Sequence, residues 1–234
     1  MSMYAMADLH LSFAQNKPMN IFGDNWNNHA EKIKQNWIQK VKEGDYVILS
    51  GDFSWATYLE DTKADFAYLN DLPGNKILLK GNHDYWWTTL TSMRKFLQEN
   101  YFEKIDFLYN NSYCIEDRII VGTRGWNILD NEDGNKMMKR ECARLERSIQ
   151  EGIQKYGKNK EVIAFFHYPP IIFNMTYKKV ENDFIGILKK YDIKKCYYGH
   201  LHGSSQKDAV TGEIDGIEYK LISADYLNFD LVKI

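Results

Sequence analysis

Short apolar runs recur along the chain, and each of them ends in polar residues. The runs are four or five residues long and are rich in Ile, Val, Leu, Tyr or Phe. Apolar runs of this length are typical of buried strands, in particular those of parallel sheets that are covered on both faces. We therefore predict buried strands at residues 3–7, 46–50, 76–80, 162–166 and 195–198.

Between these runs, apolar side chains recur at intervals of three or four residues, which is the period of an amphipathic helix. The clearest repeats are Ala30, Ile33, Trp37 and Val41, and then Met138, Cys142, Leu145, Ile149 and Ile153. They predict helices over residues 25–42 and 135–156. Weaker patterns favour helices at 57–71, 88–99 and 180–191, strands with a turn in the tail at 217–234, and a loop at 127–135. Strands that alternate with helices indicate the α/β class.

Each predicted strand leads directly into a polar motif. In α/β folds, ligands bind beyond the carboxyl ends of the strands, so we expect the motifs to gather in one pocket. Five of the six histidines belong to them, and only His29 lies outside. Together the motifs offer enough oxygen and nitrogen ligands for two metal ions. The motifs are Asp8-Leu9-His10, Gly51-Asp52, Gly81-Asn82-His83-Asp84, His167 and Gly199-His200-Leu201-His202.

Two of the motifs contain pairs of ligand-type residues at positions i and i+2. In an extended segment such side chains point to the same side. Asp8 and His10 would then reach one ion together, and so would His200 and His202. An Asp-x-His pair by itself is often an ordinary polar contact, whereas two histidines between glycines at a strand end indicate a metal site more strongly.

Two single residues are ambiguous when each is taken alone. Asp52 has two carboxylate oxygens, with which it could bridge two cations, but it could equally cap the helix that follows. His167 ends an apolar strand, where a histidine is either a ligand or a core residue with satisfied ring nitrogens. Only the other motifs favour the metal-binding interpretation of both.

The most specific motif is Gly81-Asn82-His83-Asp84. Asn82 can offer a neutral carbonyl oxygen to a metal ion, and His83 can act as an acid or a hydrogen-bond donor. Asp84 can orient His83 and raise its basicity, as carboxylates behind histidines do. The alternative is an asparagine-rich turn with no chemical role.

The composition fits one folded domain, residues 1–234, with 44% hydrophobic and 26% charged residues. The net charge of −2 and the pI of about 6.3 are unlike the strongly basic balance of a dedicated nucleic-acid binder. Long DNA or RNA is therefore not expected as a partner. Lysines cluster between residues 178 and 195, where a solvated helix face is the simpler interpretation and a phosphate-attracting rim the alternative.

Cysteine usage and the absence of targeting patterns bear on location. Cys114, Cys142 and Cys196 form no CxxC motif, so we expect free thiols in a reducing compartment. The N-terminus lacks the basic region of a signal peptide, and no apolar run is long enough to span a membrane. The sequence predicts a cytoplasmic protein without a membrane partner.

In their order and spacing, the five motifs over residues 8–202 resemble those of the calcineurin-like metallophosphoesterase superfamily, in particular its bacterial phosphodiesterase-type branch. This resemblance implies a four-layer α-β-β-α sandwich of two mixed β-sheets flanked by helices, with a dinuclear metal centre at one edge. His83 would lie beside the metals, supported by Asp84. The implied ligands are Asp8, His10 and His202 for one ion, Asn82, His167 and His200 for the other, and Asp52 as the bridge.

The resemblance also implies an enzyme, a phosphoric ester hydrolase that cleaves a small phosphodiester or nucleotide. Attack would come from a hydroxide that bridges two divalent ions, with His83 assisting the leaving group. Mixed nitrogen and oxygen ligands suit Mn, Fe, Zn, Co or Ni, and we favour manganese. A phosphomonoesterase acting on nucleotides or sugar phosphates is the alternative, and a non-catalytic metal-binding scaffold is the rival from another class.

One departure argues against protein phosphatase activity. The Ser/Thr protein phosphatase branch carries an Arg shortly after Gly-Asp and a Glu at the end of Gly-Asn-His-Glu. This chain has Phe53-Ser54-Trp55 and Asp84 at those places.

Four residues are candidates for substrate contacts. Tyr85 and Trp86 follow the Gly-Asn-His-Asp motif, and Trp55 follows Gly51-Asp52, so their rings could stack on a base or a sugar. The alternative is that these rings only pack the loops. Arg124 lies between glycines after an apolar strand, where its guanidinium could bind a phosphate through two hydrogen bonds or form a surface salt bridge.

Overall fold

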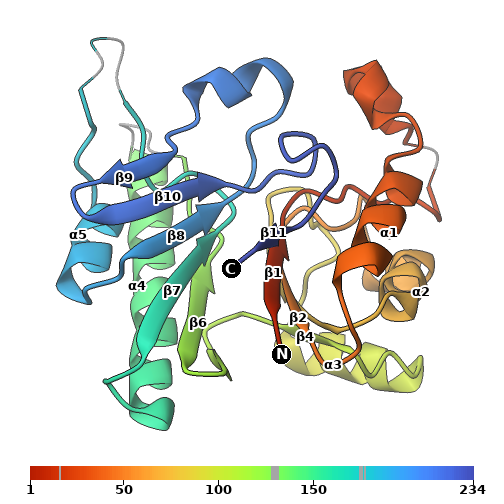
Figure 1. Ribbon diagram of the computed structural model, residues 1–234, viewed down its shortest axis with the longest axis horizontal. Helices are drawn as coiled ribbons and strands as arrows, with labels where there is room; N and C mark the ends of the chain where they lie inside the picture. The colour runs from red at the N-terminus through yellow and green to blue at the C-terminus, as the bar shows by residue number, and fades with distance from the viewer. Residues whose placement is uncertain (16, 128–131, 174–175, 177) are drawn as a thin grey trace.

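Two β-sheets lie face to face, with helices on their outer sides (Figure 1). The computed structural model describes residues 1–234 except 16, 128–131, 174, 175 and 177. In the first sheet, order β11-β1-β2-β3-β4, all neighbours are parallel except β11. In the second, order β5-β6-β7-β8-β10-β9, only the edge strands β5 and β9 are antiparallel. Both sheets are therefore mixed, and the predicted α/β fold class is confirmed.

The strands are short, and the longest have six residues. Those of the first sheet are β1 (Met3–Met6), β2 (Tyr46–Ser50), β3 (Asn75–Leu79), β4 (Ile105–Phe107) and β11 (Val232–Lys233). Those of the second sheet are β5 (Tyr113–Ile115), β6 (Arg118–Thr123), β7 (Glu161–Phe166), β8 (Lys195–Tyr198), β9 (Gly212–Ile214) and β10 (Ile217–Leu221).

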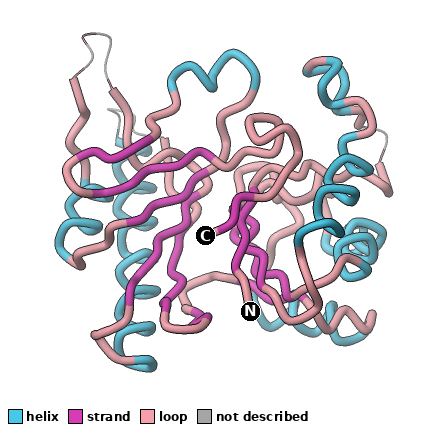
Figure 2. Tube along the Cα trace, viewed as in Figure 1, coloured by secondary structure: helices cyan, strands magenta, loops and turns pink. Residues whose placement is uncertain are grey.

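Helices cover the outer face of each sheet (Figures 1 and 2). The first sheet is covered by α1 (His29–Lys40), α2 (Lys63–Asp71) and α3 (Leu90–Glu99), and the second by α4 (Glu132–Tyr156) and α5 (Asp183–Lys190). Short 3-10 helices occur at η1 (Met19–Phe22), η2 (Asp24–Trp26), η3 (Leu59–Thr62) and η4 (Gly203–Asp208). Within the described residues, no helix combines the length and the apolar character needed to cross a membrane.

The apolar runs are continuous because both faces of the central strands are buried. In β1, the side chains of Met3 and Ala5 belong to the core between the sheets, while Tyr4 and Met6 belong to the core under the helices of the first sheet. The strand β7 alternates in the same way between the inter-sheet core and the core under α4 and α5. Alternation along a strand thus divides its side chains between two apolar layers, and no polar face is needed.

Most predicted elements are found within a few residues of their expected bounds. The strands β2 and β8 agree with the prediction, whereas α1 begins only at His29 because the 3-10 helix η2 precedes it. Three strands of three residues each, β4, β5 and β9, were not predicted. The expected loop at 127–135 is wrong at its end, since α4 begins at Glu132, and its residues 128–131 lie outside the described residues.

A lysine lies in the core at the start of β3. Lys76 is 1% exposed, and its ammonium donates a hydrogen bond to the carbonyl of Leu72, at the end of α2. Burial, and after it the nearby charge of Lys104, lower the pKa of Lys76 to about 7. A charged lysine is costly in such a place because it has lost most of its hydration.

Replacing this lysine by an apolar side chain of similar length should stabilise the protein. We expect Lys76→Met to raise the free energy of unfolding at pH 7 by on the order of 1–4 kcal/mol. Between pH 7 and 10.5 the wild-type folded state binds fewer protons than the unfolded state, so wild-type stability should rise with pH across this window. The variant should lack that rise, and the two proteins should converge near pH 10.

Urea denaturation at pH 7, 8.5 and 10 measures both effects. The matched control is Lys194→Met, which removes an exposed ammonium in the loop before β8 and should change stability by no more than about 0.5 kcal/mol. A wild-type stability that does not vary between pH 7 and 10 would contradict the proposed burial of a titrating lysine.

Candidate metal centre

The polar motifs gather where the carboxyl ends of β1, β2, β3, β7 and β8 meet at one edge of the two sheets. Backbone hydrogen bonds join the loops that leave these strands. Asp8 N donates to the carbonyl of Gly51 at 2.9 Å, and Gly199 N donates to the carbonyl of His167 at 3.1 Å. Backbone hydrogen bonds between these loops therefore hold the motifs together, independently of contacts between side chains.

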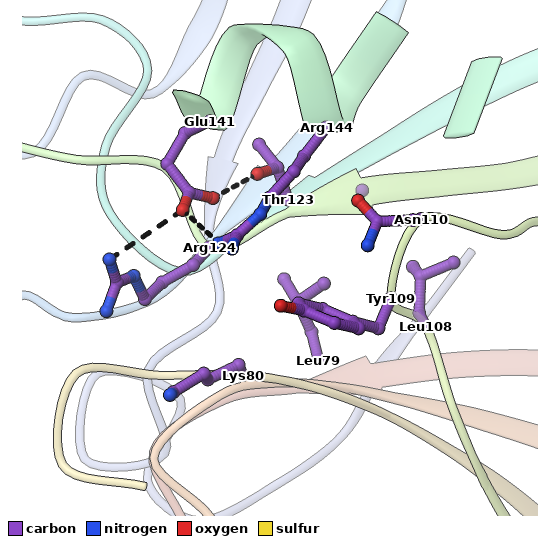
Figure 3. A pocket seen from close by; sticks show the side chains of 10 residues that line it. Leu79, Lys80, Leu108, Tyr109, Asn110, Thr123, Arg124, Glu141 and Arg144 are labelled. Atoms are coloured by element: carbon purple, nitrogen blue, oxygen red, sulfur yellow. Dashed lines mark hydrogen bonds and ion pairs between the residues drawn. The ribbon is translucent and has the colours of Figure 1, made fainter. Parts of the chain in front are cut away.

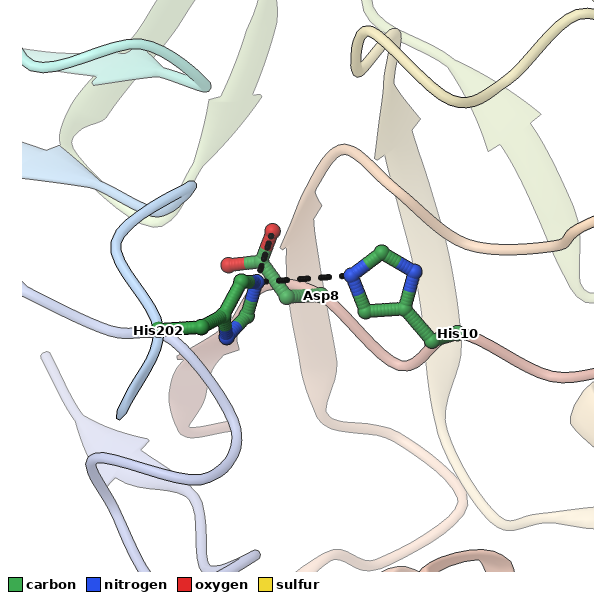
Figure 4. A group of neighbouring side chains, drawn as sticks. All are labelled: Asp8, His10 and His202. Carbon is green, nitrogen blue, oxygen red and sulfur yellow. Dashed lines mark hydrogen bonds and ion pairs between the residues drawn. The ribbon is translucent and has the colours of Figure 1, made fainter. Parts of the chain in front are cut away.

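Asp8, His10 and His202 form the first group of possible metal ligands (Figure 4). Their ligand atoms lie within 4.8 Å of one another. His202 Nε2 is 3.4 Å from Asp8 Oδ1 and 3.3 Å from His10 Nε2. The structure thus brings together the three residues that the family resemblance implied for one ion.

Asp52, His167 and His200 form the second group, with the same spread of ligand atoms. Asn82 belongs beside them, because its Oδ1 lies 2.6 Å from His167 Nε2. The rings of His167 and His200 meet edge to face, with centroids 5.0 Å apart. The residues suggested for the second ion are therefore also neighbours.

Asp52 lies between the two groups. Its Oδ2 is 3.8 Å from His10 Nε2 and 3.4 Å from His167 Nε2, so one carboxylate oxygen faces a histidine of each group. The other oxygen, Oδ1, accepts a hydrogen bond from the backbone N–H of His83 at 2.8 Å. This is the position that a bridging ligand would need.

The carboxylates of the site are buried, and their charged neighbours are histidines. Asp8 and Asp52 are 0% and 1% exposed, and no Lys or Arg of the described chain pairs with either. Oδ1 of Asp8 has no hydrogen-bond partner among the residues that the structure describes. Because an ionised carboxylate in such surroundings needs a compensating charge, the site fits divalent cations.

The pKa values follow the same electrostatics. Burial alone would raise the pKa of Asp8, but the facing His202 outweighs it and lowers that pKa to about 2. Burial would likewise lower the pKa of His202, but Asp8 and Asp225 raise it to about 10. The negative potential is therefore strongest where the histidine nitrogens converge on the carboxylates.

The backbone of the site is strained, and this corrects the expectation of extended segments. Asp8, His10, Asp52 and His200 have φ values of 63°, 46°, 51° and 75°, in the left-handed region that costs roughly 1–3 kcal/mol for a residue with a side chain. The i and i+2 rule of strands therefore does not align the pairs. The turns are held instead by loop-to-loop hydrogen bonds, such as His10 N to the carbonyl of Asp52 at 3.0 Å.

Two glycines allow the close approach of backbone and carboxylate. A Cβ at Gly81 would overlap Oδ1 of Asp52, and one at Gly199 would lie 2.5 Å from Oδ2 of Asp8. The N–H group after Gly199 uses this space, since His200 N donates to Asp8 Oδ2 at 2.9 Å. Glycine is therefore required at both positions by packing against the carboxylates of Asp52 and Asp8.

Asp84 does not have the role that the sequence suggested. Its carboxylate accepts hydrogen bonds from five N–H groups, none of them on the His83 ring, so the expectation that Asp84 orients His83 is corrected. These donors are the backbone N–H groups of Gly81, Asp52, Phe53 and Ser54 and the indole of Trp86. Asp84 therefore fastens the loop after β2 to the loop after β3.

His83 is held by contact with an aromatic ring instead. Its ring is tilted by 48° to that of Trp55, with centroids 4.5 Å apart, and the same indole stacks on His10 at 4.9 Å. Nδ1 of His83 is buried without a hydrogen-bond partner in the described part of the chain. Trp55 thus lies in the site as the sequence suggested, but it positions two histidines and is not a free platform.

The structure places the other three candidate substrate-contacting residues in different surroundings. Trp86 is 2% exposed, packs against Phe53 and donates its indole N–H to Asp84, so its predicted substrate contact is wrong. Tyr85 is 61% exposed beside His83 and stays available. Arg124 lies after β6, where its carbonyl accepts from His167 N at 3.2 Å.

Sequence reasoning missed two residues of the site. Asp225 accepts a hydrogen bond from Nδ1 of His202 at 2.8 Å and another from Gly203 N at 3.1 Å, which fixes the orientation of that imidazole. Trp26, 2% exposed, places its ring edge-on to His10 and His202. Asp225 follows the strand β10, and a carboxylate after a strand is a signal that could have found it.

Comparison with known proteins places the fold and the family. The structure of phosphopantetheinyl hydrolase from Mycobacterium tuberculosis has a TM-score of 0.56 at 13% identity, over 100% of this chain and 95% of that one. A protein of Thermus thermophilus has a TM-score of 0.56 at 12% identity, over 99% and 97%. A protein of unknown function from Aquifex aeolicus has 0.50 at 18% identity, over 99% and 95%.

Comparison with curated proteins gives no match. The structural relatives share the fold, but their sequence identities are too low to indicate a common activity. The family model of the calcineurin-like phosphoesterases matches residues 1–204, which includes every motif at the strand ends. The chain belongs to the calcineurin-like phosphoesterase family and is a metal-dependent phosphoester hydrolase.

Proposed function

We propose that this hydrolase holds two divalent ions and cleaves phosphodiesters. The observation that carries the proposal is the position of Asp52, whose Oδ2 faces His10 of one ligand group and His167 of the other. Asp8, His10 and His202 would hold one ion and Asn82, His167 and His200 the other, with Asp52 common to both. The mixed nitrogen and oxygen donors suit several transition metals, and manganese is the first to test.

Two ions in these positions would supply Lewis-acid activation of the phosphoryl group and lower the pKa of bound water. The chain would supply the rest. His83 stands beside the ligand groups, 5.8 Å from the ring of His10, and would donate a proton or a hydrogen bond to the leaving oxygen. Trp55 would hold the imidazole in place for that step, since the two rings are in contact.

A groove beside the site favours diesters over monoesters. It has a volume of about 330 Å³ and is lined by Trp55, by Lys17 and Pro18, and by the apolar residues Met19, Ile21 and Phe22 of η1. A monoester carries one organic group, whereas a diester carries a second, which this groove would take up. The structural relative named as a phosphopantetheinyl hydrolase fits phosphoester cleavage on this fold and says nothing about the substrate here.

The first test is hydrolysis of bis(p-nitrophenyl) phosphate beside p-nitrophenyl phosphate. Protein stripped with EDTA should be inactive, and Mn²⁺ should restore activity, with the diester preferred. Asp52→Asn should abolish turnover because it removes the shared carboxylate. His83→Ala should lower kcat by about 10²- to 10⁴-fold with metal content unchanged, as expected for loss of an acid.

The matched control is Asp117→Asn, which removes a carboxylate that is 95% exposed and lies in the turn between β5 and β6. It should leave both activities intact. Turnover of the monoester alone would favour a phosphomonoesterase. A protein that binds two ions and cleaves neither compound, nor any nucleotide diester, would favour the scaffold.

A second test concerns the support behind His202. We expect Asp225→Asn to weaken one of two Mn²⁺ sites by about 10- to 100-fold, because the carboxylate that orients His202 is lost. Equilibrium dialysis or calorimetry would measure the two affinities separately. The site of His167 and His200 should keep its affinity, and an equal loss at both sites would contradict the assignment of ligands to two ions.

A further inference from the structure

Two hollows between the sheets do not suit an ester group of the substrate. The one lined by Lys80, Arg124 and Arg144, among others, has a volume of about 10 Å³, room for about one water molecule (Figure 3). Its neighbour has a volume of about 540 Å³, but no residue of the candidate metal centre is among its described lining residues. A group attached to a phosphoryl at the metal centre therefore needs another place.

The groove beside Trp55 is continuous with the site. The indole of Trp55 lines the groove and also contacts the rings of His10 and His83, whose centroids are 4.9 Å and 4.5 Å from its own. Its Nε1 donates a hydrogen bond to Sδ of Met19 at 3.1 Å, which joins the ring to η1. A group attached to phosphorus beside the two histidines would pass along this indole. We call the place the η1 groove and define it by Lys17, Pro18, Met19, Ile21, Phe22 and Trp55.

The walls of the η1 groove are apolar and open to solvent. Ile21 and Phe22 are adjacent on η1 and are 72% and 61% exposed. Large apolar side chains that are exposed together mark a surface that is covered on binding. The groove volume of about 330 Å³ lies within the range of about 300–1,000 Å³ that small-ligand sites have. An alkyl or aryl group would gain affinity there, by about fourfold for each methylene that it buries fully.

The charge of the η1 groove disfavours cationic groups. Lys17 is the one charged residue among the described residues that line it, and none of these residues is a carboxylate. The ammonium of Lys17 lies over the ring of Trp55, 4.7 Å from the centroid. An aromatic face alone attracts quaternary ammonium groups, but a second cation at this indole would be repelled by the first. Shape and charge together therefore select apolar groups without a positive charge.

We propose that the η1 groove binds an uncharged alkyl or aryl ester group of the substrate. Ile21 and Phe22 provide the apolar contacts, and Lys17 excludes cationic groups of the same shape. The substrate class is then phosphodiesters with one apolar, uncharged ester group, as opposed to esters of amino alcohols. The inference rests on the proposed function, because it takes the metal centre as the place of the phosphoryl group.

The test compares three phosphonates, whose C–P bonds resist hydrolysis. They are methylphosphonate, (4,4-dimethylpentyl)phosphonate and 3-(trimethylammonio)propylphosphonate, and the last two have the same shape but differ by one charge. Each would be measured as a competitive inhibitor of bis(p-nitrophenyl) phosphate hydrolysis by the Mn²⁺-loaded protein, and its direct binding by calorimetry. We expect the uncharged compound to bind about 10- to 100-fold more tightly than methylphosphonate, and the ammonium compound to bind no more tightly than methylphosphonate.

Variants assign these preferences to particular residues, with methylphosphonate as the reference in each protein. Ile21→Ser and Phe22→Ser should each lower the relative affinity for the uncharged compound by about 3- to 10-fold, because part of an apolar wall is lost. Phe22→Leu should keep most of that affinity. Lys17→Met should raise the relative affinity for the ammonium compound by about 3- to 10-fold, since the ring of Trp55 becomes free for it, whereas Lys17→Arg should not.

The matched control is Ile38→Ser, which removes an apolar side chain of α1 that is 55% exposed and does not line the groove. It should leave both preferences unchanged. An equal loss in this variant would attribute the effect to surface hydrophobicity in general and overturn the proposal. Equal binding of the three phosphonates by the wild type, or tightest binding of the ammonium compound, would also overturn it. Circular dichroism and metal content check that each variant is folded.

Failure of the η1 groove and failure of the proposed function give different results. A wild type that cleaves the diester but binds the uncharged phosphonate no more tightly than methylphosphonate would overturn the inference about the groove alone. A wild type that does not cleave the diester would overturn the proposed function. Calorimetry would then still decide whether Ile21 and Phe22 bind the apolar group.

Discussion

Burial of three carboxylates away from any lysine or arginine partner is the constraint on which the site depends, within the described residues. Asp8, Asp52 and Asp84 all lie at the junction of the two sheets with at most 1% exposure. Asp84 is satisfied by the protein itself, through five N–H donors that join two loops. Asp8 and Asp52 meet histidines and, over the residues that the structure describes, have no Lys or Arg partner. Asp84 therefore has a structural role, whereas Asp8 and Asp52 are placed where they could bind metal cations.

Much of the fold could be predicted because the central strands are buried on both faces and so appear in the sequence as unbroken apolar runs. The edge strands β4, β5 and β9 were not predicted because three residues are too few to show an alternation of apolar and polar side chains. The ligand motifs could be predicted as neighbours because they all end strands. Their geometry could not, since positive φ values at Asp8 and His10 are set by contacts between loops.

Residues that act through other residues were the hardest to foresee. Asp225 is separated from His202 by 23 positions, and its place after a strand puts it at the same sheet edge without naming His202 as its partner. Trp86 and Trp55 look alike in the sequence, yet one lies under Asp84 in the core and the other against the histidines. Lys80 and Arg124 line one small pocket from opposite sheets, a proximity that only the docked sandwich creates. The cytoplasmic location stays a prediction, although all three cysteines are free, as expected.

The placement of ligands on both sheets has a consequence for folding. Asp8 and His10 leave the first sheet, whereas His202 follows β8 in the second, so an ion bound by these residues would cross-link positions 8 and 202. That link closes nearly the whole chain into one loop, and the entropy that loop closure removes from the unfolded chain grows with loop length. The same ion would therefore act much as a long-range disulfide does, keeping the two sheets docked.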